Sequence, residues 1–152
     1  DKDLKKFKEK NLNILITIGQ INNSTLREKM FNYLTSLGFI LPVITSPKAY
    51  VSKKIKIGNG SIIMHNVVVN SSVEIGKNCI INNNSLVEHG VRIKNHTHIS
   101  TGVIINGDCE IGNNSFIGSG SVVKEGVKIG NNSIIGMGQI IKKDIKDNQL
   151  VR

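Results

Sequence analysis

The stretch VEIGKNCIINNNSLVEHGVRIKNHTHISTGVIINGDCEIGNNSFIG, residues 73–118, repeats one pattern of residues every six positions. Every sixth residue is Val or Ile, and this column continues without an insertion from Val51 to Ile141. A second column lies two residues earlier in each repeat and holds small or aliphatic residues from Ala49 to Ser133. An internal repeat of this kind decides the fold before any local feature is considered.

The period of six predicts short strands joined by tight corners. Six is a multiple of two, so both columns point to the same side of a strand, and it is far from the helical spacing. The residues between the columns are Gly, Asn, Asp, Lys and Ser, which favour turns. One such strand cannot bury its face alone, so the repeats must wind and stack into a solenoid. Each inward Val or Ile then contributes about 1.5–3 kcal/mol.

The hexapeptide pattern resembles the left-handed parallel β-helix of the hexapeptide acyltransferases, in which three repeats form one triangular coil. The left hand is implied by this resemblance, because parallel crossovers are otherwise right-handed. We therefore expect a mainly β protein whose solenoid has roughly five coils over residues 49–144, with both columns inward.

The chain before the repeat predicts a different structure. An amphipathic segment over residues 1–10 precedes a buried strand over residues 13–18. A helix then starts near Thr25, which forms a capping box with Glu28, and stops before Gly38.

A second strand, over residues 39–44, completes a helix–strand–helix–strand order, which is half of a doubly wound α/β domain. We expect residues 1–47 to be a partial, Rossmann-like α/β domain whose N-terminal part is missing. Residues 48–145 are expected to form the β-helix domain, and the tail over residues 145–152 is too short to form anything alone.

The composition limits the classes of partner that we expect for the protein. The formal charge is +9, but the basic residues are scattered lysines and aromatic residues make up only 4%, which argues against nucleic acid. A phosphate-bearing ligand would suit the positive field. Cys79 and Cys109 fall on the inward small column, which predicts buried reduced thiols. The sequence contains neither a signal peptide nor a membrane-spanning apolar run, so we expect a cytoplasmic protein with no membrane partner.

A base and an amide fall at one corner of the predicted solenoid. His89 lies two residues after the Val/Ile column, and Gly107, eighteen residues later, occupies the same corner one coil on. Stacked coils are roughly 4.8 Å apart, so the two residues meet. An imidazole takes up a proton near neutral pH, and a glycine amide can hold an oxyanion. This pair is sufficient for acyl transfer, although an exposed corner histidine without a catalytic role would give the same pattern.

Three short motifs strengthen this interpretation. They are IIN at residues 80–82, LVEH at residues 86–89 and NHTHIS at residues 95–100, followed by Gly107. Together they resemble the sialic acid O-acetyltransferase-like family, which includes N-acetyltransferases acting on UDP-bacillosamine precursors and GDP-perosamine. The resemblance implies an acetyltransferase that uses acetyl-CoA and no metal. It also implies a nucleotide sugar or sialic acid as acceptor, and a homotrimer whose sites lie between two subunits.

The resemblance also assigns roles to residues. His89 matches the general base, His98 the histidine that lines the acetyl-CoA site, and Gly107 the glycine whose amide faces the thioester carbonyl. Asn82 matches an asparagine near the acceptor sugar. Ser119 and Met137, eighteen residues apart, match the groove in which coenzyme A lies.

Two further residues are candidates from their positions. Glu88, which precedes the base, is a candidate catalytic residue. His65, which has the same phase within its repeat as His89, is a candidate for substrate binding. The sequence departs from the family at Gly90, where an acidic residue usually raises the basicity of the base, at Ser46-Pro47 and at Thr101. The nucleotide-sugar loop of the family is not among the 152 residues. The weaker base implied by Gly90 slightly favours an amine over a hydroxyl acceptor.

Two other functions remain open at this point. A metalloenzyme similar to the γ-class carbonic anhydrases would need three histidines that converge on zinc across a trimer interface, although His89, His96 and His98 are crowded in the sequence. A non-catalytic binding or assembly solenoid would not bind coenzyme A. Assembly itself is predicted by apolar residues that precede the inward column and face outward, because such a surface is too apolar to stay bare. They are Ile62, Val68, Ile80, Leu86, Ile104 and Ile134.

Overall fold

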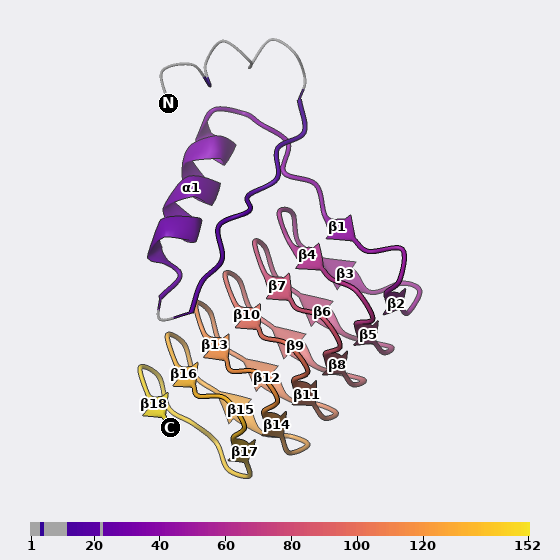
Figure 1. Ribbon diagram of the computed structural model, residues 1–152, viewed down its shortest axis with the longest axis vertical. Helices are drawn as coiled ribbons and strands as arrows, with labels where there is room; N and C mark the ends of the chain where they lie inside the picture. The colour runs from indigo at the N-terminus through magenta and orange to yellow at the C-terminus, as the bar shows by residue number, and fades with distance from the viewer. Residues whose placement is uncertain (1–3, 5–11, 22) are drawn as a thin grey trace.

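The computed structural model describes residues 4, 12–21 and 23–152 (Figure 1). Apart from residue 4, the amphipathic segment predicted over residues 1–10 lies outside the described residues. An extended N-terminal segment and helix α1 (Thr25–Ser36) precede a parallel solenoid built from two-residue strands, β1 to β18. Among the described residues, no helix is both long enough and apolar enough to span a membrane.

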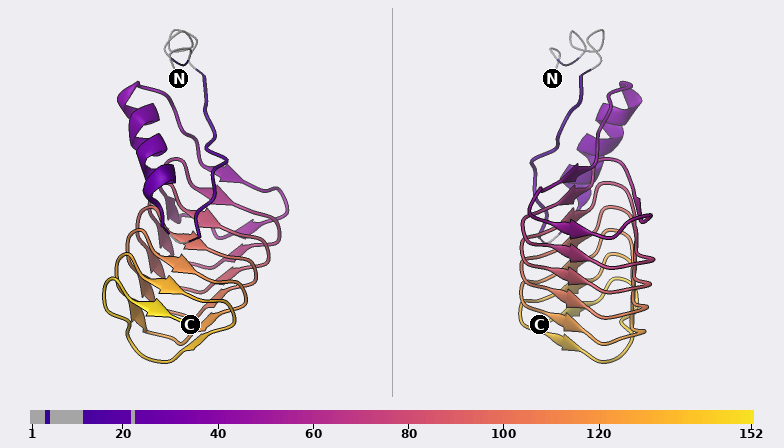
Figure 2. Two further views of the ribbon diagram at one scale, coloured as in Figure 1. Left: turned by 60° about the vertical axis from the view of Figure 1, so that its left-hand side comes forward. Right: turned by 90° about the vertical axis from the view of Figure 1, so that its right-hand side faces the viewer.

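The strands form three parallel sheets, the sides of the solenoid (Figure 2). Sheet 1 contains β1 (Ile44–Thr45), β4 (Ile62–Ile63), β7 (Ile80–Ile81), β10 (His98–Ile99), β13 (Phe116–Ile117), β16 (Ile134–Ile135) and β18 (Leu150–Val151). Sheet 2 contains β2 (Tyr50–Val51), β5 (Val68–Val69), β8 (Leu86–Val87), β11 (Ile104–Ile105), β14 (Val122–Val123) and β17 (Ile140–Ile141). Sheet 3 contains β3 (Lys56–Ile57), β6 (Glu74–Ile75), β9 (Arg92–Ile93), β12 (Glu110–Ile111) and β15 (Lys128–Ile129).

The sheet register confirms three hexapeptides per coil. Ile99 pairs with Ile81 in the preceding coil and with Ile117 in the next, eighteen residues away in each direction. From Ile63 to Ile141 the Val/Ile column is buried inside the solenoid, as predicted. Val51 and Ile57, in the first coil, are partly buried and pack against this core.

The small residues of the second inward column leave space for the Val/Ile column, and they also form hydrogen bonds. Its hydroxyl groups donate hydrogen bonds to the carbonyl fifteen residues later, as from Ser85 to Ser100 (2.8 Å) and from Thr97 to Gly112 (2.7 Å). Buried hydroxyl groups are therefore satisfied by the next corner. Cys109 Sγ bonds to a carbonyl in the same way, and burial raises the pKa of the Cys79 thiol to about 11, so both thiols stay protonated.

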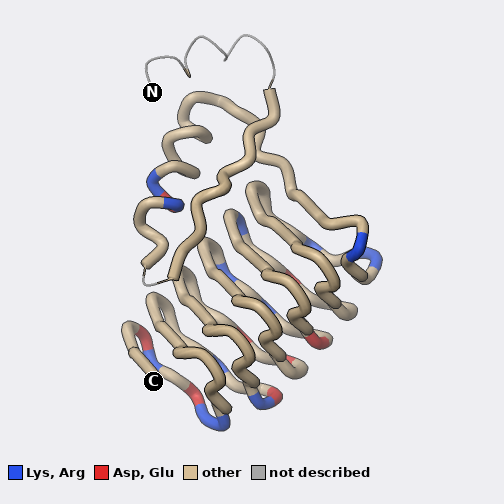
Figure 3. The backbone as a smooth tube through the Cα atoms, in the orientation of Figure 1, with Lys and Arg blue, Asp and Glu red and all other residues tan. Residues whose placement is uncertain are grey.

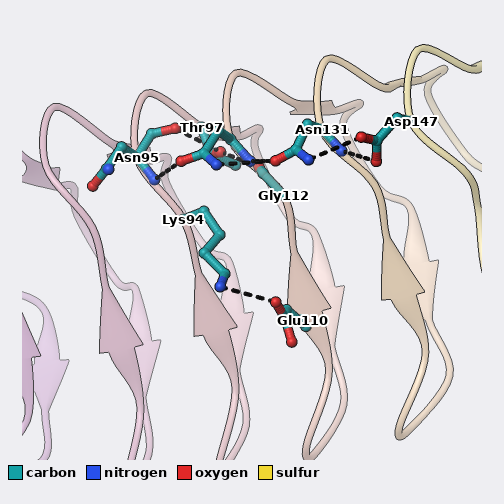
Figure 4. Close-up of polar contacts among 8 residues, drawn as sticks. Lys94, Asn95, Thr97, Glu110, Gly112, Asn131 and Asp147 are labelled. Atoms are coloured by element: carbon teal, nitrogen blue, oxygen red, sulfur yellow. Dashed lines mark hydrogen bonds and ion pairs between the residues drawn. The ribbon is translucent and has the colours of Figure 1, made fainter.

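A ladder of amides holds one corner of the solenoid together (Figure 4). The side-chain oxygen of Asn113 accepts the backbone N–H of Asn95, that of Asn131 accepts the N–H of Asn113, and Asp147 accepts the N–H of Asn131. The oxygen–nitrogen distances are 2.8–3.1 Å. The Asn residues between the two columns therefore connect coils as well as forming turns.

The solenoid is longer than the sequence predicted. Ile44–Thr45, expected to end a strand of the α/β domain, forms β1 and pairs with β4. The tail, expected to form nothing alone, contributes β18, which pairs with β16 after a coil two residues shorter than the others. Both ends were missed because Thr45 interrupts the Val/Ile column and the shorter last coil breaks its spacing.

The N-terminal part differs from the prediction in detail. Where two strands were expected, the described residues show a single parallel bridge between Asn13 and Ile40. The predicted capping box is wrong, because Ser24 is the N-cap and makes no side-chain capping bond. The helix ends as expected, with Gly38 at a φ of 80° and its N–H bonded to the Thr35 carbonyl. The Rossmann-like domain itself stays a prediction.

Candidate active site

The corners of the solenoid form three edges. Edge A joins sheet 1 to sheet 2, edge B joins sheet 2 to sheet 3, and edge C joins sheet 3 back to sheet 1. His65 lies on edge A, His89 on edge B and His96 on edge C, whereas His98 is on the outer face of sheet 1. The four histidines of the sequence are thus distributed around the solenoid.

On edge B, the imidazole of His89 lies directly over Gly107. A Cβ atom added to Gly107 would be 2.7 Å from Cε1 and 2.8 Å from Nε2 of His89. Only glycine leaves room for the ring at this point. The structure therefore brings together the two residues that the eighteen-residue spacing predicted to meet.

The backbone N–H of Gly107, a buried residue, takes no part in the hydrogen bonds between coils. The N–H groups of Asn106 and Asp108, on either side of it, donate to carbonyls of Val123 and His89. The N–H of Gly107 has no such acceptor among the described residues. The amide of the buried Gly107 and the imidazole of the exposed His89 thus stand side by side, which is the arrangement that stabilises an oxyanion next to a base.

Glu88 does not contact the ring of His89. Its Oε2 atom accepts a hydrogen bond from Asn70 Nδ2 (2.9 Å) and from the backbone N–H of His89 (3.3 Å). Its carboxylate therefore joins two coils and caps the corner. Its predicted catalytic role stays a prediction.

His98 belongs to a buried cluster on sheet 1. Its side chain is 7% exposed, and Nδ1 donates a hydrogen bond to the Gln20 carbonyl oxygen (2.6 Å). The ring also lies edge-on to Phe116 and has Nε2 3.5 Å from Asn82 Nδ2. Burial lowers the pKa of His98, which keeps the ring neutral, and the bond to Gln20 leaves Nε2 as the hydrogen-bond acceptor.

His98 and Asn82 line a mainly apolar pocket of about 330 Å³ between the N-terminal segment and sheet 1. Its apolar wall comes from the outer face of sheet 1 and from residues 15–18 of the segment. The apolar lining residues are Leu15, Ile16, Ile18, Ile62, Met64 and Ile80.

Arg27 holds this pocket together, and the sequence analysis missed it. The side chain is 1% exposed, and its guanidinium donates to the carbonyl oxygens of Ile16 and Ile18 at 2.8 and 2.7 Å and to that of Gly60 at 3.3 Å. Burial lowers the pKa of Arg27 from its ordinary value. The signal was present, since Arg27 lies on the same helical face as the buried Phe31 and Leu34.

The remaining predicted residues lie on edge A. His65 bonds through Nδ1 to Ser46 Oγ (2.5 Å), away from His89, because a phase shared within a hexapeptide recurs on all three edges. Ser119 and Met137 stand one coil apart, joined by the bond from the Gly138 N–H to the Ser119 carbonyl. Met137 is 81% exposed.

The candidate residues therefore form two groups within one chain. His89, Glu88 and Gly107 are on edge B, whereas Asn82, Ser119 and Met137 are on edge A with His98 beside them. The strands of sheet 2 separate the two edges. The part of the chain that the structure describes contains no group of three potential metal ligands, and His89, His96 and His98 do not converge within one chain.

Comparisons with known proteins identify a matching family and several solved structures that are similar over most of the chain. Residues 43–151 match the family described as GMPPB C-terminal domain. No curated protein sequence matches the chain. The structure of PerB from Caulobacter crescentus, in complex with CoA and GDP-perosamine, is similar with a TM-score of 0.92 and 30% identity, over 99% of this chain and 72% of PerB.

Two other solved structures are similar over most of the chain. The acetyltransferase domain of PglB from Neisseria gonorrhoeae, in complex with acetyl coenzyme A, has a TM-score of 0.88 and 28% identity, over 96% of this chain and 72% of that one. WeeI from Acinetobacter baumannii has a TM-score of 0.81 and 28% identity, over 87% and 65% of the two chains.

Proposed function

The chain belongs to the GMPPB C-terminal domain family and to the hexapeptide-repeat nucleotide amino-sugar acetyltransferases, and we propose that it transfers the acetyl group of acetyl-CoA to a nucleotide-linked sugar. The observation that carries this function is the imidazole of His89 over Gly107, whose N–H points to no protein acceptor among the described residues. The likeness to structures that hold CoA, acetyl coenzyme A and GDP-perosamine supports both substrates.

Each group has a step in the proposed reaction. His89 removes a proton from the acceptor amine or hydroxyl as that group attacks the thioester carbonyl. The carbonyl oxygen becomes negative in the tetrahedral intermediate, and the Gly107 N–H donates to it. When the C–S bond breaks, the thiolate of coenzyme A takes the proton from the imidazolium. The likeness to a perosamine N-acetyltransferase favours an amine over a hydroxyl acceptor.

Asn82 and the Nε2 atom of His98 supply polar contacts beside the apolar pocket. We assign Asn82 to the acceptor sugar and His98 to acetyl-CoA, with Ser119 and Met137 along the coenzyme groove of edge A. His65 stays a weaker candidate for substrate binding. A bacterial surface sugar or a sialic acid is the acceptor class that the sequence motifs favour.

A homotrimer would complete the site. Within one chain, edge B and edge A are separated, but a second copy packed against sheet 2 can bring its edge A group towards His89 of the first. The outward residues of sheet 2 are apolar in every coil after Tyr50, which supports such packing. A left-handed coil, a Rossmann-like nucleotide-sugar domain built around residues 1–47 and a cytoplasmic location remain parts of this proposal.

The test is an assay of coenzyme A release by the full-length protein with acetyl-CoA and a panel of nucleotide amino sugars and sialic acids. Release is expected with at least one nucleotide amino sugar. We expect His89→Ala to lower the rate by roughly 10²–10⁴, the usual contribution of a general base, with little change in coenzyme A affinity. Absence of both coenzyme A binding and release would instead support a non-catalytic solenoid.

A further inference from the structure

Two carboxylates lie next to His89 on edge B, those of Glu88 and Asp108. The carboxylate of Glu88 is already bound by Asn70 and by the backbone N–H of His89. It is therefore not the group that orients the ring.

Asp108 comes from the next coil and is tied to His89 through the backbone. Its N–H donates to the carbonyl oxygen of His89 at 2.9 Å, and it directly follows Gly107, over which the ring lies. Its side chain occupies the space that a side chain at position 90 would need. A Cβ atom added to Gly90 would be 2.1 Å from Asp108 Oδ1. Gly90 has no side chain, and the space that one would occupy holds the carboxylate of Asp108 from the following coil.

The two ring nitrogens of His89 have different surroundings. Nε2 is closer to Gly107, whose added Cβ would be 2.8 Å from Nε2 and 3.3 Å from Nδ1. Nδ1 is the ring nitrogen nearer to its own backbone, and the Asp108 carboxylate lies against the backbone of the next residue, Gly90. The Asp108 carboxylate therefore lies beside the residue that follows His89, but the structure shows no hydrogen bond between it and the His89 ring. Catalytic hydrogen bonds commonly tighten only when substrate binds.

We propose that Asp108 is the positioning residue for His89, because its carboxylate, placed over Gly90 by the coil stacking, accepts the Nδ1–H of the imidazole. This inference rests on the proposed function, in which His89 is the base. With Nδ1 protonated, the lone pair of Nε2 faces the acceptor group and takes its proton. The negative charge of the carboxylate stabilises the imidazolium that forms. The acidic partner is supplied by stacking across coils instead of by the residue after the base.

A tautomer measurement tests this independently of activity. In ¹⁵N NMR spectra of the neutral His89 ring, we expect the Nδ1–H form to dominate in the parent protein and to decrease in Asp108→Gly. Glycine suits the φ of 58° at position 108, so this variant is expected to fold with an unchanged circular dichroism spectrum. The matched control is Glu125→Gln, which removes an exposed carboxylate on the same edge one coil beyond Gly107 and should leave the tautomer unchanged.

A carboxylate transfer gives the second test. Asp108→Gly is expected to lower kcat by about tenfold, a part of the contribution of a general base, with the KM for acetyl-CoA unchanged. Adding Gly90→Asp to this variant places the carboxylate beside His89 from the preceding coil, into the space that Asp108 has left, and should restore most of kcat. Asp is among the residues best able to adopt the φ of 69° at position 90.

The possible failures are distinguishable. An unchanged tautomer in Asp108→Gly overturns the role of Asp108, and so does a parental kcat in that variant when His89→Ala is impaired. A parental rate in His89→Ala contradicts the proposed base, whatever the tautomer measurement shows.

Discussion

The outer faces of sheets 2 and 3 are built by the same repeat and carry opposite surfaces. The outward residue of each strand in sheet 2 is apolar or aromatic: Tyr50, Val68, Leu86, Ile104, Val122 and Ile140. In sheet 3 the same position alternates in charge along the stack: Lys56, Glu74, Arg92, Glu110 and Lys128. Figure 3 shows where the charged residues lie on the chain. Inside the solenoid, the two sheets contribute the same Val/Ile column.

The difference shows which positions the fold determines and which it leaves free. An inward residue must be apolar or small because it is stacked between coils. An outward residue has no such constraint, so its character reports what that face contacts. The ion pairs Lys56–Glu74 and Lys94–Glu110 on sheet 3 are compatible with a surface that faces water. The apolar and aromatic face of sheet 2 instead favours contact with a second copy of the chain.

The largest effect is expected from an inward change. Ile99 is fully buried between the neighbouring coils, so Ile99→Asp would bury an unpaired carboxylate and should prevent folding. The outward Arg92→Gln on sheet 3 is the control and should change the free energy of unfolding by no more than about 0.5 kcal/mol. Circular dichroism and urea unfolding measure both. A folded Ile99→Asp protein would show that the column is not the core.

The next largest effect should come from the outer face of sheet 2. Replacing Leu86 and Ile104 together with Glu puts charges on the apolar face without touching the core, so the fold should survive and the assembly should dissociate. Analytical ultracentrifugation is the measurement, and we expect the variant to be monomeric and inactive. The matched control replaces Glu74 and Glu110 on sheet 3 with Gln. A sheet 2 variant with the same mass in solution as the parent would contradict an interface on this face.

The periodicity predicted the solenoid because its inward positions obey one simple rule. It also placed His89 on Gly107, because the coil length converts a spacing of eighteen residues into a contact. The same periodicity could not separate His65 from His89, since a six-residue phase does not say which edge a residue occupies. To assign a residue to an edge, one must use the eighteen-residue period of a whole coil instead of the six-residue period of one repeat.

The six-residue pattern could not predict the contacts between the N-terminal segment and the solenoid. The bond from His98 to the Gln20 carbonyl joins residues 78 positions apart, and the guanidinium of Arg27 meets the carbonyl of Gly60 across 33 positions. No repeat connects these residues. The position of Asp108 over Gly90 follows from the eighteen-residue spacing, but its side-chain direction required coordinates.

A smaller, pH-dependent effect should appear on sheet 1, whose outer face is partly covered by the N-terminal segment. Burial lowers the pKa of His98 in the folded chain, while the unfolded chain keeps the ordinary value of about 6.5. The unfolded state therefore binds the proton more readily, and stability that is complete above pH 6.5 should be lost as the pH falls below it.

Urea unfolding at pH 7.5 and 5.5 measures this loss. His98→Asn keeps a donor near the Gln20 carbonyl but cannot titrate, so its stability should depend less on pH than that of the parent. The pKa of His96 is also lowered by burial, so only the difference between parent and variant is attributed to His98. Equal pH dependence in the two proteins would contradict the buried neutral ring.

The smallest effect is expected on sheet 3. Lys94 and Glu110 form an ion pair of 3.0 Å with side chains that are 46% and 34% exposed. Because water screens such pairs, Glu110→Gln should reduce the free energy of unfolding by less than about 1 kcal/mol. Urea unfolding at low and high salt checks this, and a larger loss would mean that the charged face contributes more to stability than a solvated surface does.

The central claim is that an active site contains His89 from one copy of the chain and Asn82 from another. Mixed assemblies of His89→Ala and Asn82→Ala, two variants expected to be nearly inactive alone, test it most directly. If the copies mix at random, about a quarter of the sites hold both parental residues, and coenzyme A release should recover to that fraction of the parental rate. Mixed assemblies no more active than either variant alone would contradict a site shared between copies.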